Sequence, residues 1–236
     1  MATFESRQSD FPYSVVQRIV KGSKMNAIIL TRSGKYGGAC VAGIDLETNT
    51  FVRFVGEAYT AKEIPFSDIR GINELDIVEV KTIRRCPIGP QTENILVPRA
   101  AFCKKDKYSG TIEDLQASIL YPDDPSLLET TDNRLKTVDC FQHSLEMVLV
   151  RNLLLKKYIK PYDNCLTTRA SFSIGSLYYD DFRVTDFKYD LRESEDESIM
   201  IPYAAVVLSI PKNGFSVNGI DMGYYKFIAS IFPIYQ

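Results

Sequence analysis

Tryptophan is absent from the 236-residue sequence, and histidine occurs once. A metal site built from several histidines is therefore excluded. The cysteines are odd in number and widely spaced, without a C-x-x-C pair, which argues against a zinc site and a disulfide framework. They are Cys40, Cys86, Cys103, Cys140 and Cys165. We predict a protein of the reducing cytoplasm that holds no metal and no cofactor.

Long apolar runs and nucleotide or hydrolase motifs are also missing. No stretch reaches the roughly 18 apolar residues of a membrane helix, and residues 1–10 lack the apolar segment of a signal peptide. The glycine-rich residues 34–38 miss the P-loop spacing, and no G-x-S-x-G elbow accompanies His143. We favour a non-catalytic protein without membrane contact. A nuclease using paired acids such as Asp180 and Asp181 is the enzyme alternative.

Charge is unevenly distributed along the chain. Residues 1–110 hold 16 basic and 12 acidic side chains, whereas residues 111–236 hold 12 basic and 18 acidic ones. A basic first half can steer a phosphate-bearing ligand, and the acidic second half can serve another partner. Ordinary surface variation explains the split equally well.

Short runs of β-branched and aromatic residues between turn signals predict a mainly β protein. In the first half, strands are expected at residues 27–30, 39–46, 51–55, 75–83 and 94–98. In the second half they are expected at residues 145–150, 153–159, 166–174, 182–189, 203–210 and 225–232. About five strands in each half match two tandem five-stranded OB-like barrels.

Helices are expected in few places. Thr111 is a suitable N-cap for a helix over residues 111–121, which Pro122 ends. A long helix over residues 144–159 is the rival to two strands there. We divide the chain into a tail or short helix at 1–24, a first barrel at 25–122, a connection at 123–143 and a second barrel at 144–236.

The first barrel carries the best candidate binding site. Glycines allow close backbone approach, their N–H groups can hold phosphate oxygens, basic residues add charge and a tyrosine can stack on a base. The candidate loop and the third strand supply Arg32, Ser33, Lys35, Tyr36, Gly37, Gly38 and Arg53. The end of the fourth strand adds Lys81, Arg84 and Arg85. A glycine hairpin with a solvated basic rim is the structural alternative.

Residues 30–43 (LTRSGKYGGACVAG) and 51–55 (FVRFV) resemble the motifs of bacterial dual OB-containing domain proteins. Residues 178–186 and 225–229 are similar to that family's second barrel and last strand. The family often has a basic residue where Ala39 stands and a tryptophan where Phe51 stands. The resemblance implies two OB barrels and recognition of nucleic acid, often in bacterial conflict or anti-phage settings.

These observations lead to three functional hypotheses. The first is a non-catalytic module that recognises single-stranded or structured nucleic acid on the basic face of the first barrel. The second is a protein-interaction or assembly subunit that binds its partner through the acidic second barrel, with exposed tyrosines near residues 178–179 or 224–225. The third is a nucleotide or small-molecule sensor that binds its ligand between the barrels.

Overall fold

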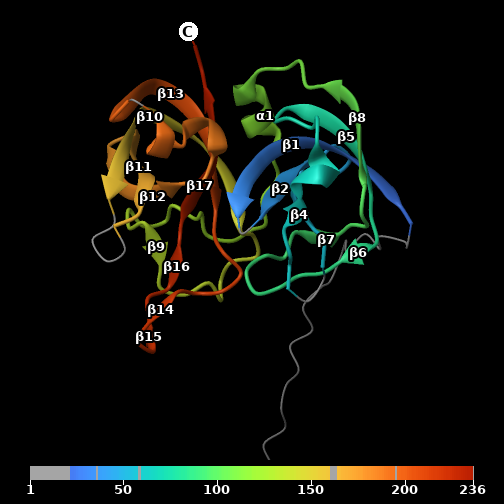
Figure 1. Cartoon of the computed structure of the whole chain (residues 1–236), viewed down its shortest axis with the longest axis horizontal. Helices are drawn as coiled ribbons and strands as arrows, with labels where there is room; N and C mark the ends of the chain where they lie inside the picture. The colour runs from blue at the N-terminus through green and yellow to red at the C-terminus, as the bar shows by residue number, and fades with distance from the viewer. Residues whose placement is uncertain (1–21, 36, 58–59, 160–163, 195, 236) are drawn as a thin grey trace, which may run out of the picture.

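The computed structural model describes residues 22–235, apart from residues 36, 58–59, 160–163 and 195. Two β-sheet units lie side by side, one from each half of the chain (Figure 1). The predicted mainly β fold is confirmed. The predicted tail or short helix at residues 1–24 lies almost wholly outside the described residues.

The first barrel is formed by a sheet of eight strands. Its strands are β1 (Lys24–Lys35), β2 (Gly38–Asp45), β3 (Phe51–Val55), β4 (Ile64–Pro65), β5 (Asp76–Lys81), β6 (Arg84–Arg85), β7 (Asn94–Leu96) and β8 (Phe102–Lys107). They are ordered β6-β7-β3-β2-β1-β5-β8, with β4 on β2. A 3₁₀ turn, η1 (Phe66–Ile69), follows β4.

Two features bend this sheet back on itself. The N–H of Ile83, just after β5, donates to the carbonyl of Leu96 on β7 at 2.8 Å. Beyond it, β6 pairs antiparallel with β7, while β3 pairs with β7 in parallel. The continuation of β5 therefore meets β7 around a core that includes Ile29, Val41 and Phe54.

The second barrel is closed, in the order β10-β11-β12-β17-β13. These strands are β10 (Leu145–Ile159), β11 (Leu166–Ile174), β12 (Leu177–Val184), β13 (Ser198–Ser209) and β17 (Phe227–Pro233). The smaller elements are β9 (Arg134–Leu135), β14 (Ser216–Val217), β15 (Ile220–Asp221), β16 (Tyr224–Tyr225), η2 (Phe187–Tyr189) and η3 (Leu191–Glu193). The parallel β12–β17 pair corresponds to β3–β7 in the first barrel.

The structure corrects the type or the bounds of several predicted elements. The rival helix over residues 144–159 is wrong, because that window is the single long strand β10. A bulge between Arg151 and Leu154, with Asn152 at φ 53°, lets β10 continue through what we predicted as two strands. The strand expected at 182–189 lies earlier, because β12 ends at Val184 and the turn η2 follows.

Helix α1 (Ile112–Ser118) begins where the sequence indicates. The hydroxyl of Thr111 accepts a hydrogen bond from the N–H of Asp114 at 3.0 Å, which satisfies one free N–H of the first turn. The helix ends at Ser118, before the expected end at residue 121. Leu115 is its buried residue and packs at the contact between the barrels.

The segment 123–143 packs closely against the second barrel. Leu127, Leu128 and Leu135 belong to the core of that barrel. Lys226 is almost completely buried, and its ammonium donates to the carbonyl of Thr130 at 2.9 Å. Burial lowers the pKa of Lys226 to about 8, because an ammonium loses hydration there.

An apolar layer joins the two barrels. The outward side chains of β1, β2 and β3 meet those of β10, β13 and β17, with α1 at the edge. The buried members of this layer are Ile28, Leu30, Ala42, Ile44, Phe51, Leu115, Ile119, Leu145, Met147, Ala205, Val207 and Phe232. Burying a large aliphatic side chain contributes about 1.5–3 kcal/mol, so this layer holds the barrels firmly together.

Candidate nucleic-acid interface

Packing within the protein accounts for much of the predicted glycine-basic loop. A Cβ on Gly34 would lie 2.0 Å from the Phe187 ring of the second barrel, and one on Gly38 would lie 2.9 Å from the carbonyl oxygen of Ile64. Gly37 takes φ 87° in the turn. These glycines therefore allow a neighbouring barrel, a neighbouring strand and a tight turn.

The polar residues of that loop are only partly available. Ser33 is buried, and the guanidinium of Arg32 donates to the side-chain oxygen of Asn73 at 3.0 Å and to the carbonyl of Ile72. Tyr36 and the side chain of Lys35 lie outside the part of the chain that the structure describes. A phosphate cradle made by this loop stays a prediction.

Arg53 corrects our expectation of an exposed basic strand. It is buried, and its Nε donates to Glu93 Oε1 at 3.2 Å. Its Nη2 reaches across the barrel contact to Ser144 Oγ at 2.8 Å and Ser209 Oγ at 3.2 Å. Arg53 thus joins the barrels and is not accessible to a ligand.

The burial of Arg53 follows from where its strand lies. Arg53 pairs with Ala42 of β2, and Ala42 belongs to the apolar layer between the barrels. OB folds commonly bind oligonucleotides on the face of their second and third strands. In the first barrel, the second barrel covers that face.

The remaining predicted residues lie near the short strand β6. Lys81 and Arg84 are exposed, and Arg85 is half-buried. The guanidinium of Arg84 donates to the carbonyl of Arg85 at 3.3 Å. These cations remain accessible, but they do not share a surface with Arg53.

The second barrel carries a basic row that the sequence reasoning missed. Lys156 of β10 lies opposite Arg169 of β11, and Arg169 lies opposite Arg183 of β12. Lys156 and Arg183 are exposed, and Arg169 is half-buried. All three point outward, because neighbours such as Leu155, Ala170 and Phe182 form the core. This row crosses the face of the second barrel that corresponds to the covered strand face of the first barrel.

A second row adds aromatic rings to this face. Arg151 of β10 lies opposite Tyr203 of β13 and Ser173 of β11, and Ser173 lies opposite Tyr178 of β12. The guanidinium of Arg151 lies 5.4 Å from the centre of the Tyr203 ring, within cation–π range. Tyr178 is 59% exposed. Its neighbour Tyr179 points into the core, so the tyrosine patch expected at 178–179 is a single ring.

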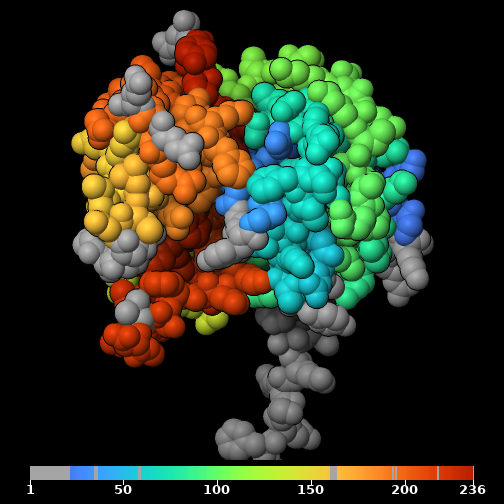
Figure 2. Space-filling model, viewed as in Figure 1, coloured from blue at the N-terminus to red at the C-terminus, as the bar shows by residue number. Residues whose placement is uncertain are grey.

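Tyr158 connects the aromatic and basic features. Its ring is 40% exposed on β10, and the Arg169 guanidinium lies 5.3 Å from the ring centre. We define the outer face of the second barrel by these outward side chains. They are Arg151, Lys156, Tyr158, Arg169, Ser173, Tyr178, Arg183 and Tyr203. In Figure 2 the yellow and orange atoms of β11–β13 form the surface on the side away from the first barrel.

One acidic side chain borders the basic row. Asp181 lies 3.5 Å from Arg169 Nε and accepts a hydrogen bond from Asn133 at 2.8 Å. It partly offsets the charge of Arg169, whereas Lys156 makes no ion pair among the described residues. Like charges directly opposite each other destabilise a sheet. A bound phosphate would relieve that repulsion.

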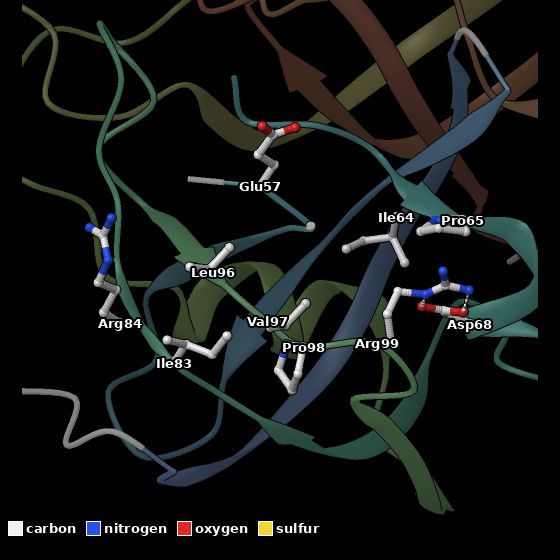
Figure 3. Close-up of a pocket in the computed structure, with 11 residues that line it drawn as sticks. Glu57, Ile64, Pro65, Asp68, Ile83, Arg84, Leu96, Val97, Pro98 and Arg99 are labelled. Carbon is white, nitrogen blue, oxygen red and sulfur yellow. Dashed lines mark hydrogen bonds and ion pairs between the residues drawn. The ribbon is translucent and has the colours of Figure 1, made fainter. Parts of the chain in front are cut away.

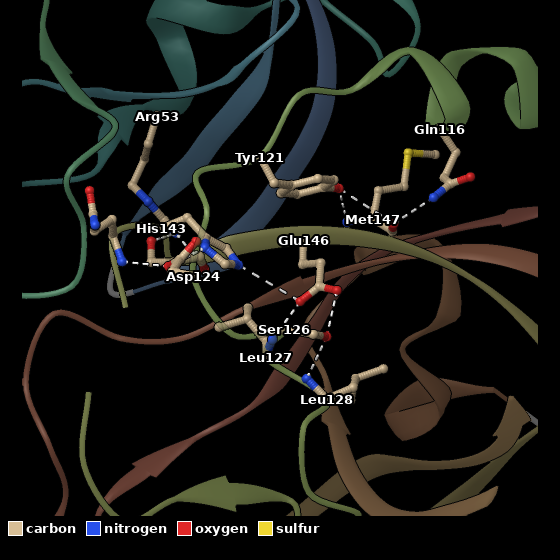
Figure 4. Close-up of polar contacts among 12 residues, drawn as sticks. Arg53, Gln116, Tyr121, Asp124, Ser126, Leu127, Leu128, His143, Glu146 and Met147 are labelled. Atoms are coloured by element: carbon tan, nitrogen blue, oxygen red, sulfur yellow. Dashed lines mark hydrogen bonds and ion pairs between the residues drawn. The ribbon is translucent and has the colours of Figure 1, made fainter. Parts of the chain in front are cut away.

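A polar cluster next to Arg53 holds the only histidine (Figure 4). His143 Nδ1 lies 2.8 Å from Asp124 Oδ2, and Nε2 lies 3.8 Å from Glu146 Oε2. Burial lowers the pKa of His143, but the two carboxylates raise it more, so the net pKa lies above its ordinary value. The cluster fastens segment 123–143 to β10. Among the described residues, the ion-pair partners of the His143 ring are these two carboxylates.

Two comparisons found similar proteins. A family model described as dual OB-containing domain matches residues 25–231. A solved structure described as "Structural mimicry for functional antagonism" is 7% identical and is similar over 92% of this chain and 93% of that chain, with a TM-score of 0.35. No curated protein matches the sequence. Within the described residues, no helix is long and apolar enough to cross a membrane, and no metal-ligand cluster was found.

Proposed function

Because the chain belongs to the dual OB-containing domain family, we propose that it is a non-catalytic module that binds single-stranded nucleic acid. The proposal places the ligand on the outer face of the second barrel. The observation that carries it is the cross-strand row of Lys156, Arg169 and Arg183. Two of these residues, Arg169 and Arg183, lie on the second and third strands of the barrel, which form the usual oligonucleotide-binding face of OB folds.

The chemistry of this face suits an unpaired strand. Cations contact phosphates without regard to sequence, and exposed rings such as Tyr158 and Tyr178 can stack on bases. A bound strand would run across β10, β11 and β12, because the cations follow each other in that direction. Because stacking on exposed rings requires unpaired bases, we expect a preference for single strands.

The first barrel then has a supporting role. Its own strand face holds the second barrel, so it contributes rigidity and leaves the outer face open on the far side. The acidic charge of the second half does not exclude this role, because four of its twelve basic residues lie on the outer face. A place in bacterial conflict stays a prediction that the family resemblance implies.

The test is fluorescence anisotropy with labelled single-stranded DNA and RNA at two salt concentrations. We expect Lys156→Glu with Arg183→Glu to weaken binding at least tenfold. The slope of log affinity against log salt should fall by about 1.4, since each phosphate contact on a single strand adds about 0.7.

A matched control is Lys105→Glu with Lys107→Glu. Both residues are exposed on β8, which is an edge strand of the first sheet and not part of the second barrel. This variant changes the net charge equally, so it should leave binding within twofold if the outer face is the site. Equal losses in both double variants would reduce the effect to overall charge, and no salt-sensitive binding by the unmodified protein would remove the proposal.

A further inference from the structure

A cavity of about 500 Å³ opens at the end of the first barrel, and none of its lining residues belongs to the outer face of the second barrel (Figure 3). It lies where the ends of β3 and β7 meet β4. Its size falls within the range of small-molecule sites. The cavity is lined by Gly56, Glu57, Ile64, Pro65, Asp68, Ile83, Arg84, Leu96, Val97, Pro98 and Arg99.

The floor of this cavity is apolar. Ile64 and Val97 are part of the barrel core, and Leu96 and Ile83 lie beside them half-exposed. Pro65 and Pro98 extend the apolar wall. Aliphatic and proline side chains of this kind bury the flat face of a ring without requiring a hydrogen bond from it.

One charged pair on the rim is already satisfied. The guanidinium of Arg99 donates to both carboxylate oxygens of Asp68, at 2.6 and 2.8 Å. Its hydrogen bonds raise the pKa of Arg99 and lower that of Asp68. Asp68 also accepts from the N–H of Ala100 at 3.3 Å. This pair shapes one wall and has little remaining charge to offer a ligand.

Two other rim charges are open to a ligand. Arg84 is exposed, and its guanidinium donates to the carbonyl of its neighbour Arg85. Glu57 is exposed, and its side chain makes no hydrogen bond or ion pair with the residues that the structure describes. In Figure 3 the two side chains stand on different sides of the apolar floor. A complementary ligand carries an anion at one end and hydrogen-bond donors at the other.

We propose that this cavity binds a guanine nucleoside 5′-monophosphate group. The phosphate lies on Arg84, the purine ring covers Leu96 and Val97, and the Glu57 carboxylate accepts from the guanine edge. A carboxylate accepts hydrogen bonds and donates none, so it matches the adjacent N–H groups of guanine. Adenine offers one amino group beside an acceptor nitrogen, which a carboxylate repels. An amino acid carries both charged groups on one carbon and cannot reach both sides.

Isothermal titration calorimetry with guanosine 5′-monophosphate tests this site. We expect saturable binding with a Kd below about 1 mM. Arg84→Ala should weaken binding about tenfold or more, because a charge-assisted bond to phosphate is lost. Glu57→Gln should remove the preference for guanosine over adenosine 5′-monophosphate, because an amide can donate as well as accept. Guanosine without its phosphate should bind like the Arg84→Ala variant binds the nucleotide.

The matched control is Lys81→Ala. Lys81 is an exposed cation on β5 near Arg84, and it does not line the cavity. Its removal should leave nucleotide affinity unchanged, and thermal unfolding should confirm that each variant is folded. Equal weakening by Lys81→Ala and Arg84→Ala, or no saturable binding by the unmodified protein, would overturn the proposal.

Two further measurements determine the source of the ligand and whether the two proposed sites are independent. An oligonucleotide with a 5′-phosphoguanosine end shows whether the group is a free nucleotide or a strand terminus, because only a terminus makes strand binding sensitive to Arg84→Ala. The outer-face variant Lys156→Glu with Arg183→Glu should bind the nucleotide normally. Loss of nucleotide binding in that variant would contradict a separate site in the first barrel, whatever the outcome for strand binding.

Discussion

The two barrels use the same strand face in opposite ways. Arg53 is the first residue of β3 to pair in parallel with β7, opposite Asn94, and Arg183 is the first residue of β12 to pair in parallel with β17, opposite Phe227. The positions therefore correspond in topology. Arg53 is buried against the second barrel, whereas Arg183 is exposed. One arginine joins the two barrels, and the other is accessible on the proposed binding face.

The residues around these arginines explain the difference. Next to Arg53, the outward positions hold Ala42, Ile44 and Phe51, which form an apolar surface that another barrel can cover. Next to Arg183, the row holds Arg169 and Lys156, which would be costly to bury together. The barrel topology is shared, and the outward side chains decide what each face contacts.

The largest effect is expected when each of the two arginines is removed in turn. Arg53→Ala leaves the carboxylate of Glu93 buried without its cation, so it should cost about 3–5 kcal/mol of unfolding free energy. Arg183→Ala removes an exposed side chain and should stay within about 0.5 kcal/mol. Urea unfolding followed by circular dichroism measures both values.

A second variant controls for the buried charge. Glu93→Gln in the Arg53→Ala background removes the unpaired carboxylate and should recover part of the lost stability. If Arg53→Ala and Arg183→Ala cost the same, the two faces are equivalent in solution and the comparison fails.

Sequence reasoning reached the fold because its signals are local. Alternation at residues 75–83 corresponds to β5, and the Thr111 cap marks the start of α1. Residues 144–159 were harder, since a long strand and a helix both suit an unbroken window. The bulge at Asn152 permits the long strand, and single-sequence patterns do not reveal bulges well.

The site was harder to predict than the fold. Alternation indicates that Arg53 points out of its barrel, but it does not tell whether solvent or a second barrel lies outside. The basic row of the second barrel comes from three separate strands, so register alone brings Lys156, Arg169 and Arg183 together. The alternating Lys156 and Tyr158 were the available sequence signal, and the net acidity of that half obscured it.

A smaller effect is expected at the second contact between the barrels. A Cβ on Gly34 of β1 would lie 2.0 Å from the Phe187 ring, so Gly34→Ala must displace that ring. Overpacking of this kind costs about 1–3 kcal/mol, and the exposed ring favours the lower end. Thermal unfolding by calorimetry measures the loss.

Phe187→Ala provides the rescue. In the double variant the added methyl no longer meets the ring, so most of the cost of Gly34→Ala should disappear. Additive losses in the double variant would mean that the cost of Gly34→Ala does not come from contact with the Phe187 ring. That result would remove Phe187 from the barrel contact.

The subtlest effect concerns pH and involves the second barrel alone. Burial lowers the pKa of His143, but Glu146 and Asp124 raise it further, so the folded pKa lies above the ordinary 6.5. The protonated ring therefore stabilises the fold fully below pH 6.5, and this contribution is lost as pH rises through the folded pKa. His143→Gln should lower unfolding free energy most at about pH 6 and least at about pH 9, as urea titrations at each pH would measure.

Because Lys226 also changes stability with pH, the unmodified protein and His143→Gln must be compared at each pH. Burial lowers the pKa of Lys226 to about 8, so the unfolded chain binds more protons above that pH and stability rises with pH there. This trend opposes the loss from His143 in the unmodified protein. It cancels in the difference between the unmodified protein and His143→Gln, because both contain Lys226. A difference that stays constant between about pH 6 and pH 9 would mean that His143 binds Asp124 as a neutral ring and adds no charge to the contact near Arg53.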